Sequence, residues 1–352
     1  MKLKLKHTLV VYNKFKGLRM FLHKKILKNI GTLLLALALT AGMLFLPEVS
    51  VNFALSGLNL WFTKMIPTLF PFMVVSGIMI RMNLVKPLCS PFEKLFLRLF
   101  GVGAEGVFCI LIGFFCGFPM GAKVITDLYK KGELSLKEAE YLLSFCNNIG
   151  PIYFCGFVLT TLNVSDKLPF IFGMYGIPVI YGMLQFQLKK IRIWKKRSFL
   201  KKRQSLGKVT YCEMQINTVP TFMEAVDGAI VSGIENITKL GGYMIFFNLF
   251  NMIPRLLMLK GVFAAFSYET KVRFTYFFSC LFEISNGVNL VKNKEPWLVL
   301  TMIPFGGLCC MAQTYSLIKD TPLSVSKYGM HKVILTVLTG GYYLLLSNYI
   351  SV

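Results

Sequence analysis

Long apolar blocks, separated by connectors rich in lysine and arginine, dominate the pattern of hydrophobic and polar positions along the chain. A helix needs about 20 apolar residues to cross a membrane. Several blocks approach that length, and the basic residues at their ends mark the cytoplasmic side. The pattern therefore predicts an all-α polytopic membrane protein with spans over residues 30–46, 65–80, 144–163, 168–188, 240–258, 298–318 and 333–350.

The apolar block at residues 107–122 is broken in its middle by Gly117, Pro119 and Gly121. Glycine tolerates positive φ and proline lacks a backbone N–H, so an unbroken helix is disfavoured. A block of about 16 residues is also too short for a span. We predict a re-entrant hairpin whose tip, CGFPMGAK (residues 116–123), lines a protein-enclosed cavity, because broken backbone at membrane depth requires such shielding.

The segments around this hairpin predict surface elements and a further break. Apolar and basic residues mix over 84–100, which favours a helix lying in the membrane interface. Residues 127–141 are polar, and Ser135 followed by Glu138 has the spacing of a capping box, which predicts a short cytoplasmic helix. The span at 144–163 opens with SFCNNIGP, in which two amides, a glycine and a proline predict a broken helix.

The second half of the chain repeats this order of elements. Thr63-Lys64 opens the first copy and Thr238-Lys239 opens the second, and an apolar span follows each pair. Interrupted segments then recur at 273–291, as the counterpart of the hairpin, and within 298–318, as the counterpart of SFCNNIGP. Their polar and helix-breaking residues are Glu283, Asn286, Gly287, Pro304, Gly306, Gly307 and Gln313.

Each copy thus contains an odd number of crossings plus one hairpin, so the second copy is expected to lie upside down relative to the first. The fold predicted is an inverted repeat of transmembrane helices with two re-entrant hairpins. Residues 1–62 comprise a basic cytoplasmic leader, an uncleaved first anchor and a connector. The first repeat covers 63–188, a basic cytoplasmic loop with an interfacial helix covers 189–237, and the second repeat covers 238–352.

Composition narrows the chemistry. Hydrophobic residues make up 55% of the chain and the formal net charge is +23. The basic residues flank apolar blocks, as expected beside anionic lipid head groups, and no nucleic-acid-binding motif accompanies them. The lipid bilayer is therefore an expected partner and nucleic acid is not.

Cysteines and histidines give no sign of a metal or cofactor site. The nine cysteines are scattered without C-x-x-C spacing, and the three histidines lie far apart, so we expect no metal, no cofactor and no disulfide framework. The apolar blocks contain no paired acids and no nucleophile with a base. No catalytic residue is assigned, and enzymatic activity is not expected.

The candidate chemistry favours an anionic solute, because hairpin tips and the starts of half-helices present unpaired N–H groups and partial positive charge. Lys123 could supply a full charge to that solute, or extend to the cytoplasmic interface. Asn147 and Asn148 could bind the solute, or bond the broken backbone of their own helix. Glu283 is the only acid within an apolar block of the second half; it is a candidate for proton coupling, or a carboxylate bound by hairpin amides. Gln313 either lines the site or bonds a neighbouring helix.

Several motifs resemble a known family. GFPMGAK, the short polar helix containing EAE, and SFxN with a proline seven residues after Ser144 resemble the nucleoside-recognition or Gate-domain membrane proteins. Within that group the chain most resembles the sporulation integral membrane protein family YlbJ, to which FGGLxxMAQ (residues 305–313) is also similar. The resemblance covers residues 63–350. It implies a fold similar to concentrative nucleoside transporters, with two hairpin tips meeting near the membrane midplane.

The resemblance also implies a function. It suggests movement of dipicolinic acid into the developing spore, across the mother-cell-derived membrane that surrounds it. A nucleoside transporter, a transporter of another small acid, and a non-transporting membrane protein needed for spore cortex assembly remain alternatives. The oligomeric state stays open, a homo-oligomer included. The residues predicted to bind substrate are Gly117, Phe118, Pro119, Gly121, Lys123, Asn147, Asn148, Glu283, Asn286, Gly287, Gly306, Gly307 and Gln313.

Overall fold

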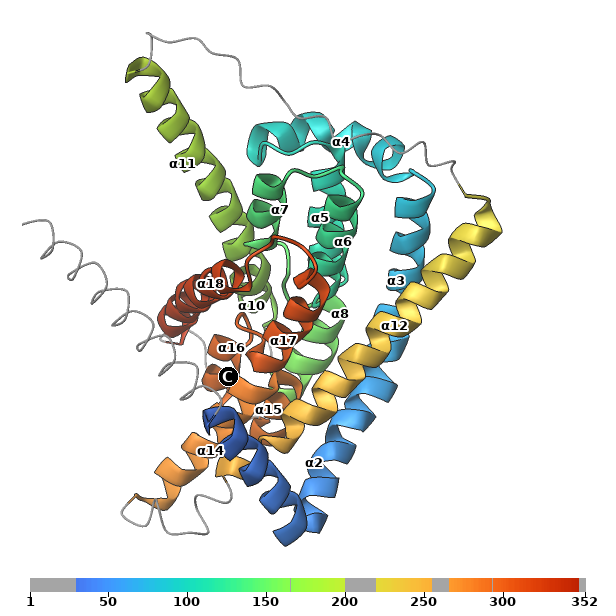
Figure 1. The fold of residues 1–352 in the computed structure, drawn as a ribbon. Helices are drawn as coiled ribbons and strands as arrows, with labels where there is room; N and C mark the ends of the chain where they lie inside the picture. Colours follow the sequence, from blue (N-terminus) through green and yellow to red (C-terminus); the bar gives the residue numbers. More distant parts are fainter. Residues whose placement is uncertain (1–29, 165, 200–219, 255–265, 293, 348–352) are drawn as a thin grey trace, which may run out of the picture.

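The computed structural model describes residues 30–164, 166–199, 220–254, 266–292 and 294–347. Every regular element within these ranges is helical, which confirms the predicted all-α class (Figure 1). Helices long and apolar enough to cross a membrane there are Pro47–Arg81, Leu168–Lys189 and Pro296–Ile318. The predicted basic leader, and most of the basic loop predicted after residue 188, lie outside the described residues.

A continuous 35-residue helix forms one side of the molecule. It consists of α2 (Pro47–Leu60), a π-helical turn η1 (Trp61–Met65) and α3 (Ile66–Arg81). A second long helix, α12 (Phe222–Leu249), packs along both α2 and α3 (Figure 1). The contact is close: a Cβ atom on Gly57 would lie 2.9 Å from the backbone oxygen of Met244.

The bounds of these two helices differ from the sequence prediction. The span predicted at 65–80 is only the C-terminal part of the 35-residue helix, because the mixed segment before it continues the same helix. Of the span predicted at 240–258, residues 255–258 lie outside the described residues, and α12 covers only residues 240–249 because it starts earlier, beside a capping box formed by Thr221 and Glu224. The division predicted after residue 237 therefore falls inside α12.

The first hairpin forms where the sequence predicts a break. Helix α4 (Val85–Leu99) is followed, after an 89° bend, by α5 (Ala104–Phe115), and α6 (Met120–Lys130) then returns along α5. Gly117 in the turn has a φ of +86°, a conformation that favours glycine. The predicted interruption of the apolar block is therefore confirmed. The α4–α5 pair would add a fourth crossing if it were one broken span.

A broken helix follows the hairpin. Helix α7 (Leu136–Leu143) begins where Ser135 accepts the N–H of Glu138 at 3.3 Å, which confirms the predicted start. Residues 144–150 are not helical, and a short apolar helix then runs through α8, η2 and α9. The span predicted at 144–163 is therefore interrupted, as its amides, glycine and proline indicate. The bounds of the short helix are Pro151–Tyr153, Phe154–Val158 and Leu159–Thr161.

The last helical run of the first half confirms the span predicted at 168–188. It consists of α10 (Leu168–Ile171), η3 (Phe172–Gly176) and α11 (Ile177–Phe199).

The second half has the same order of elements. A hairpin of α14 (Tyr268–Phe282) and α15 (Ile284–Val291) turns at Glu283. A broken pair, α16 (Pro296–Met302) and α17 (Gly307–Ile318), follows it, and α18 (Val325–Leu346) completes the half. Figure 1 places α5 and α6 in the upper part of the molecule and α14 and α15 in the lower part.

The two halves share their apolar core. One cluster of buried side chains joins α8–α10 of the first half to α14–α16 and α18 of the second. A second cluster joins α3, α5, α6 and α7 to α12 and α17. The halves are therefore interleaved, and the breaks of both lie inside one packed body.

Candidate functional site

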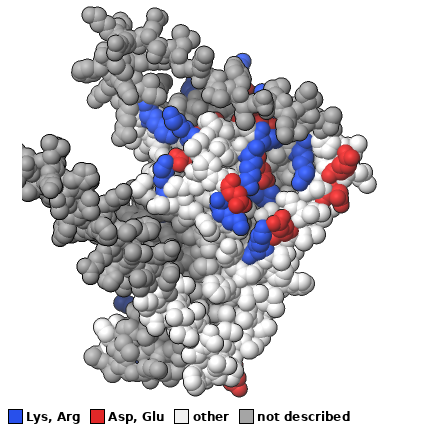
Figure 2. Space-filling model, viewed as in Figure 1, with Lys and Arg blue, Asp and Glu red and all other residues white. Residues whose placement is uncertain are grey.

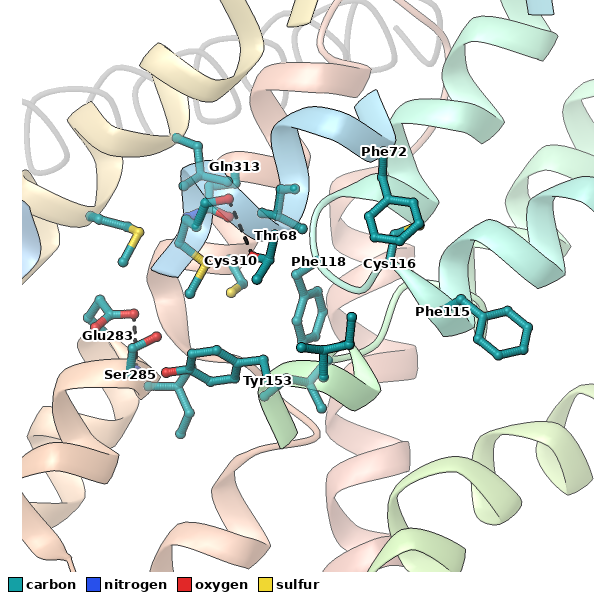
Figure 3. A pocket seen from close by; sticks show the side chains of 18 residues that line it. Thr68, Phe72, Phe115, Cys116, Phe118, Tyr153, Glu283, Ser285, Cys310 and Gln313 are labelled. Carbon is teal, nitrogen blue, oxygen red and sulfur yellow. Dashed lines mark hydrogen bonds between the residues drawn. The ribbon is translucent and has the colours of Figure 1, made fainter. Parts of the chain in front are cut away.

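A cavity of about 60 Å³, called the central cavity below, lies where both hairpin tips and the first helix break meet α17 (Figure 3). The α3 and α12 helices close one side of it, with Thr68, Leu69 and Phe72 on α3 and Leu240 and Met244 on α12. The wall contributed by the hairpins, the break and α17 includes Cys116, Phe118, Ile149, Gly150, Tyr153, Glu283, Ile284, Ser285, Cys310 and Gln313.

Glu283 lines this cavity and caps α15. Its carboxylate accepts the backbone N–H of Ser285 at 3.1 Å and of Asn286 at 2.7 Å. A carboxylate at a helix N-terminus satisfies orphan N–H donors and is stabilised by the helix dipole. The side chain is 2% exposed, so this carboxyl group is held by backbone amides inside the protein.

Polar groups without partners surround Glu283. Among the described residues, the hydroxyl of Tyr153, the hydroxyl of Ser279 and the amide nitrogen of Asn286 are buried and make no hydrogen bond. Figure 3 shows the hydroxyl end of Tyr153 directed toward Glu283 and Ser285. Buried polar groups without a partner are rare and costly, so this end of the cavity has unused capacity to bind a polar ligand.

The amides of the first break bond protein groups and do not line the central cavity. The amide nitrogen of Asn147 donates to Tyr328 at 2.9 Å and to Thr314 at 3.2 Å, and its oxygen accepts the N–H of Ala122 at 3.3 Å. Asn148 donates to the backbone oxygen of the nearby Phe145 at 2.6 Å. The sequence left two roles for these amides, binding of the solute and hydrogen bonding to the protein around the helix break. The contacts observed belong to the second role.

The glycines of the first tip allow close packing against the first break. A Cβ atom on Gly117 would lie 2.3 Å from the backbone nitrogen of Gly150, and one on Gly121 would lie 2.4 Å from the backbone oxygen of Cys146. Neither position can hold a side chain without a backbone shift. Pro119 does not line the central cavity but lines a neighbouring one.

The predicted residues of the second half divide in a similar way. Gly306 has a φ of +79°, and a Cβ atom there would lie 3.0 Å from the ring of Phe118, so the second break contacts the first tip. Gly287 and Gly307 instead pack against Cys280 in α14. Asn286 accepts a hydrogen bond from Ser56 of α2 at 3.2 Å.

Gln313 and Lys123 both line the cavity next to the central one. Gln313 lines the central cavity, and its amide nitrogen contacts the sulfur of Cys309 at 3.1 Å. Lys123 lies outside the central cavity, and its ammonium forms an ion pair with Asp127 at 2.6 Å. The cation expected beside the ligand is therefore paired one helical turn away, although its side chain is only 5% exposed.

A comparison with curated proteins places the sequence beside a known membrane protein. The sporulation integral membrane protein YlbJ of Bacillus subtilis (strain 168) is 26% identical over 326 residues, which cover 84% of this chain and 78% of the relative. The chain is a homologue of YlbJ. The predicted resemblance is therefore confirmed, and with its candidate spans the protein is an integral membrane protein. No protein-family model and no solved structure matches the sequence.

Lys332, which was not among the predicted residues, is the most buried charged side chain of this YlbJ homologue among the described residues, at 1% exposed. Its ammonium donates to the backbone oxygen of Asn147 at 2.7 Å and to the side-chain oxygen of Asn148 at 3.2 Å. It also lies 4.4 Å from the centre of the Phe118 ring, a cation–π contact. None of the ion pairs within the described ranges involves it.

A signal for Lys332 was present in the sequence. Tyr328, Lys332, Leu335, Thr339 and Tyr343 follow helical spacing, and all five are buried on one face of α18. Hydropathy alone treats such a lysine as the flank of a span that begins at the next residue. The cavity residues Tyr153 and Ser285 were also not predicted. Tyrosine is amphipathic and serine is small, and neither residue belongs to a helical pattern of buried positions like that of Lys332.

Proposed function

We propose that this protein is a multi-pass membrane transporter of a small anionic solute, built as an inverted repeat with two re-entrant hairpins. The observation that carries the proposal is the central cavity, to which both hairpin tips, the first break and α17 contribute walls. Broken helices converging on one cavity that carries a few polar groups, with matching element order in two halves, are the arrangement expected of a secondary transporter. No chemical transformation of the solute is proposed.

Two features favour an anion. Lys332 is a buried cation next to the cavity residue Phe118, and it has no carboxylate partner among the described side chains. Such a charge within a membrane protein is costly unless it serves a ligand or a pathway. The charge of Glu283 is already bound by the N-terminus of α15, which reduces its repulsion of an anionic solute.

Dipicolinic acid is the solute that we propose. It combines an aromatic ring with two carboxylates, and the central cavity offers the rings of Phe72, Phe118 and Tyr153 beside unpaired polar groups. The name of the relative concerns sporulation, which supports a role in spore formation and a place in the mother-cell-derived membrane around the forespore. Transport of a nucleoside, transport of another small acid and a non-transporting role are the alternatives that the test below distinguishes.

The test is uptake by proteoliposomes that contain the purified full chain. Labelled dipicolinate should accumulate saturably, with competition by unlabelled dipicolinate and not by uridine or succinate. Uptake of uridine would assign the nucleoside alternative, and uptake of succinate would assign a general dicarboxylate transporter. Absence of uptake above protein-free vesicles, for every solute, would refute transport.

A matched pair of variants links uptake to the cavity. Tyr153→Phe removes a buried hydroxyl that faces Glu283, whereas Tyr315→Phe removes the hydroxyl of a side chain that is 51% exposed. The first should weaken dipicolinate binding by about tenfold, the equivalent of one hydrogen bond to a charged group. The second should leave binding unchanged. Equal effects would place the binding site elsewhere.

A further inference from the structure

Three cavities follow one another along the seam between the α3–α12 pair and the rest of the protein. The central cavity shares Leu240 and Gln313 with a second cavity, called the narrow cavity, which is also lined by Pro119 and Ser316. The narrow cavity has a volume of only about 10 Å³, room for roughly one water molecule. A cavity of this size is too small to pass a solute, so the narrow cavity closes the seam next to the central cavity.

The narrow cavity in turn shares residues with a third, wider cavity. Met73 and Lys123 line both of them. The third cavity has a volume of about 240 Å³ and opens between the C-terminal ends of α3 and α6. Lys123 is thus the charged residue among the two that the wide and the narrow cavities share, and its ion pair with Asp127 lies at that junction.

This third cavity, called the basic cleft, carries strong positive charge. Four cations, Arg81, Lys123, Lys130 and Lys131, line it together with a single acid, Asp127. Figure 2 shows basic side chains, with acidic ones among them, gathered in the upper part of the molecule, whereas the described lower part of the same face carries few charges. Basic residues at the ends of spans mark the cytoplasmic side, so the cleft opens toward the cytoplasm.

Besides Lys123, which is paired with Asp127, protein groups hold Arg81 and Lys131 in place. A guanidinium nitrogen of Arg81 donates to the backbone oxygen of Gly228 in α12 at 2.9 Å. The ammonium of Lys131 donates to the backbone oxygen of Ile80 at 2.6 Å and pairs with Glu133 at 3.0 Å. Among the described residues, Lys130 and Arg81 form no ion pair, so their charge is available to an anion.

We propose that the basic cleft is the cytoplasmic binding site for small carboxylate anions, and that the seam is their route to the central cavity. This inference rests on the proposed transport function. In the route, Arg81 and Lys130 raise the local concentration of the anion, Lys123 exchanges Asp127 for a ligand carboxylate, and the narrow cavity opens to pass it. A lipid phosphate offers similar chemistry, so the experiments below separate the two sources.

The first experiment removes charge from the cleft. Arg81→Gln combined with Lys130→Gln should raise the KM for dipicolinate uptake by about tenfold at low salt and leave the maximal rate unchanged, since a charged cleft concentrates its substrate. The increase should shrink at high salt, because salt screens exposed charges. The control is Lys137→Gln combined with Lys319→Gln, two exposed lysines outside the cleft, which should behave like the parent.

The lipid composition identifies the anion. If the rise in KM persists in vesicles of phosphatidylcholine alone, the cleft acts on the free solute. A rise that occurs only with phosphatidylglycerol would assign the cleft to a lipid head group and overturn the proposal. An unchanged KM in both lipids would overturn it as well.

The second experiment tests the route. Ser232→Cys lies in the basic cleft and Ser316→Cys in the narrow cavity, and each is treated with an anionic methanethiosulfonate, with the parent chain as the baseline for its own cysteines. Modification at both positions should block uptake, and dipicolinate should slow modification of Ser316→Cys. Ser90→Cys, on the separate helix α4, should tolerate modification.

The outcomes separate the route from the function. Full uptake after complete modification of Ser316→Cys would show that the solute does not use the seam, while transport itself would stand. Absence of uptake by the parent would refute both the transport function and the route.

Discussion

Asn147 joins three helices through one side chain, and its replacement by alanine gives the most direct test of the packing around the first break. The side chain bonds the N–H of Ala122 and the hydroxyls of Thr314 and Tyr328. Thr314 keeps a second bond, to the backbone oxygen of Cys310 at 2.9 Å. Ala122 lies in the first turn of α6, where N–H groups have no partner within the helix.

The cost follows from these contacts. Two neutral hydrogen bonds to hydroxyls contribute about 1 kcal/mol each, and a buried N–H left without a partner costs about 1–3 kcal/mol. Asn147→Ala should therefore lower the free energy of unfolding by about 3–5 kcal/mol. The assay is equilibrium unfolding of the detergent-solubilised protein, followed by circular dichroism.

The matched control is Asn236→Ala. The amide of Asn236 bonds only Ser232 on its own helix among the described residues, so its loss should cost less than about 1 kcal/mol. A double-mutant cycle of Asn147→Ala with Tyr328→Phe should be non-additive by about 1 kcal/mol, because the two side chains share a bond. Equal stabilities of Asn147→Ala and Asn236→Ala would refute the structural role of Asn147.

Three other predictions use the same preparation. Glu283→Gln should lower the free energy of unfolding by about 1 kcal/mol and Glu283→Ala by about 2 kcal/mol, because glutamine keeps one acceptor for α15; unchanged stability would refute the cap. Gly113→Ala should abolish the peak of folded protein in fluorescence-detected size-exclusion chromatography, because the new Cβ would lie 1.9 Å from a backbone oxygen. The control Gly242→Ala should express normally, because no atom lies within 4 Å of its Cβ position. Lys332→Gln should weaken dipicolinate binding in calorimetry by about tenfold, while the exposed Lys327→Gln should not; equal affinities would exclude Lys332 from anion binding.

The sequence allowed the breaks to be predicted, because glycine and proline act locally. Gly117 and Gly306 adopt positive φ at positions where the apolar blocks were expected to be interrupted. The contacts of charged residues required more than local reasoning. Asp127 follows Lys123 by four residues, a spacing that predicts a helical ion pair, yet the proximity of Lys123 to the hairpin tip suggested a ligand contact instead.

Long-range contacts were beyond sequence reasoning. The partners of Lys332 are 184 and 185 residues away, and no local pattern indicates which break a lysine will reach. The bounds of α12 were also missed, because a helix that packs lengthwise on α2 and α3 need not be apolar along its whole length. Its exposed positions carry Glu224, Glu235 and Lys239, which hydropathy alone places outside a span.

The glycine contacts of the first hairpin determine which parts of the protein can move separately. Gly113 and Gly121 approach the same carbonyl oxygen of Cys146 from two sides of the hairpin, at distances that leave no space for a Cβ atom. Interlocked backbones of this kind cannot slide past each other, because close-packed interiors resist small displacements. The hairpin and the first break are therefore expected to move as one rigid unit, so in the proposed transporter a displacement along the seam with the α3–α12 pair would leave these contacts intact.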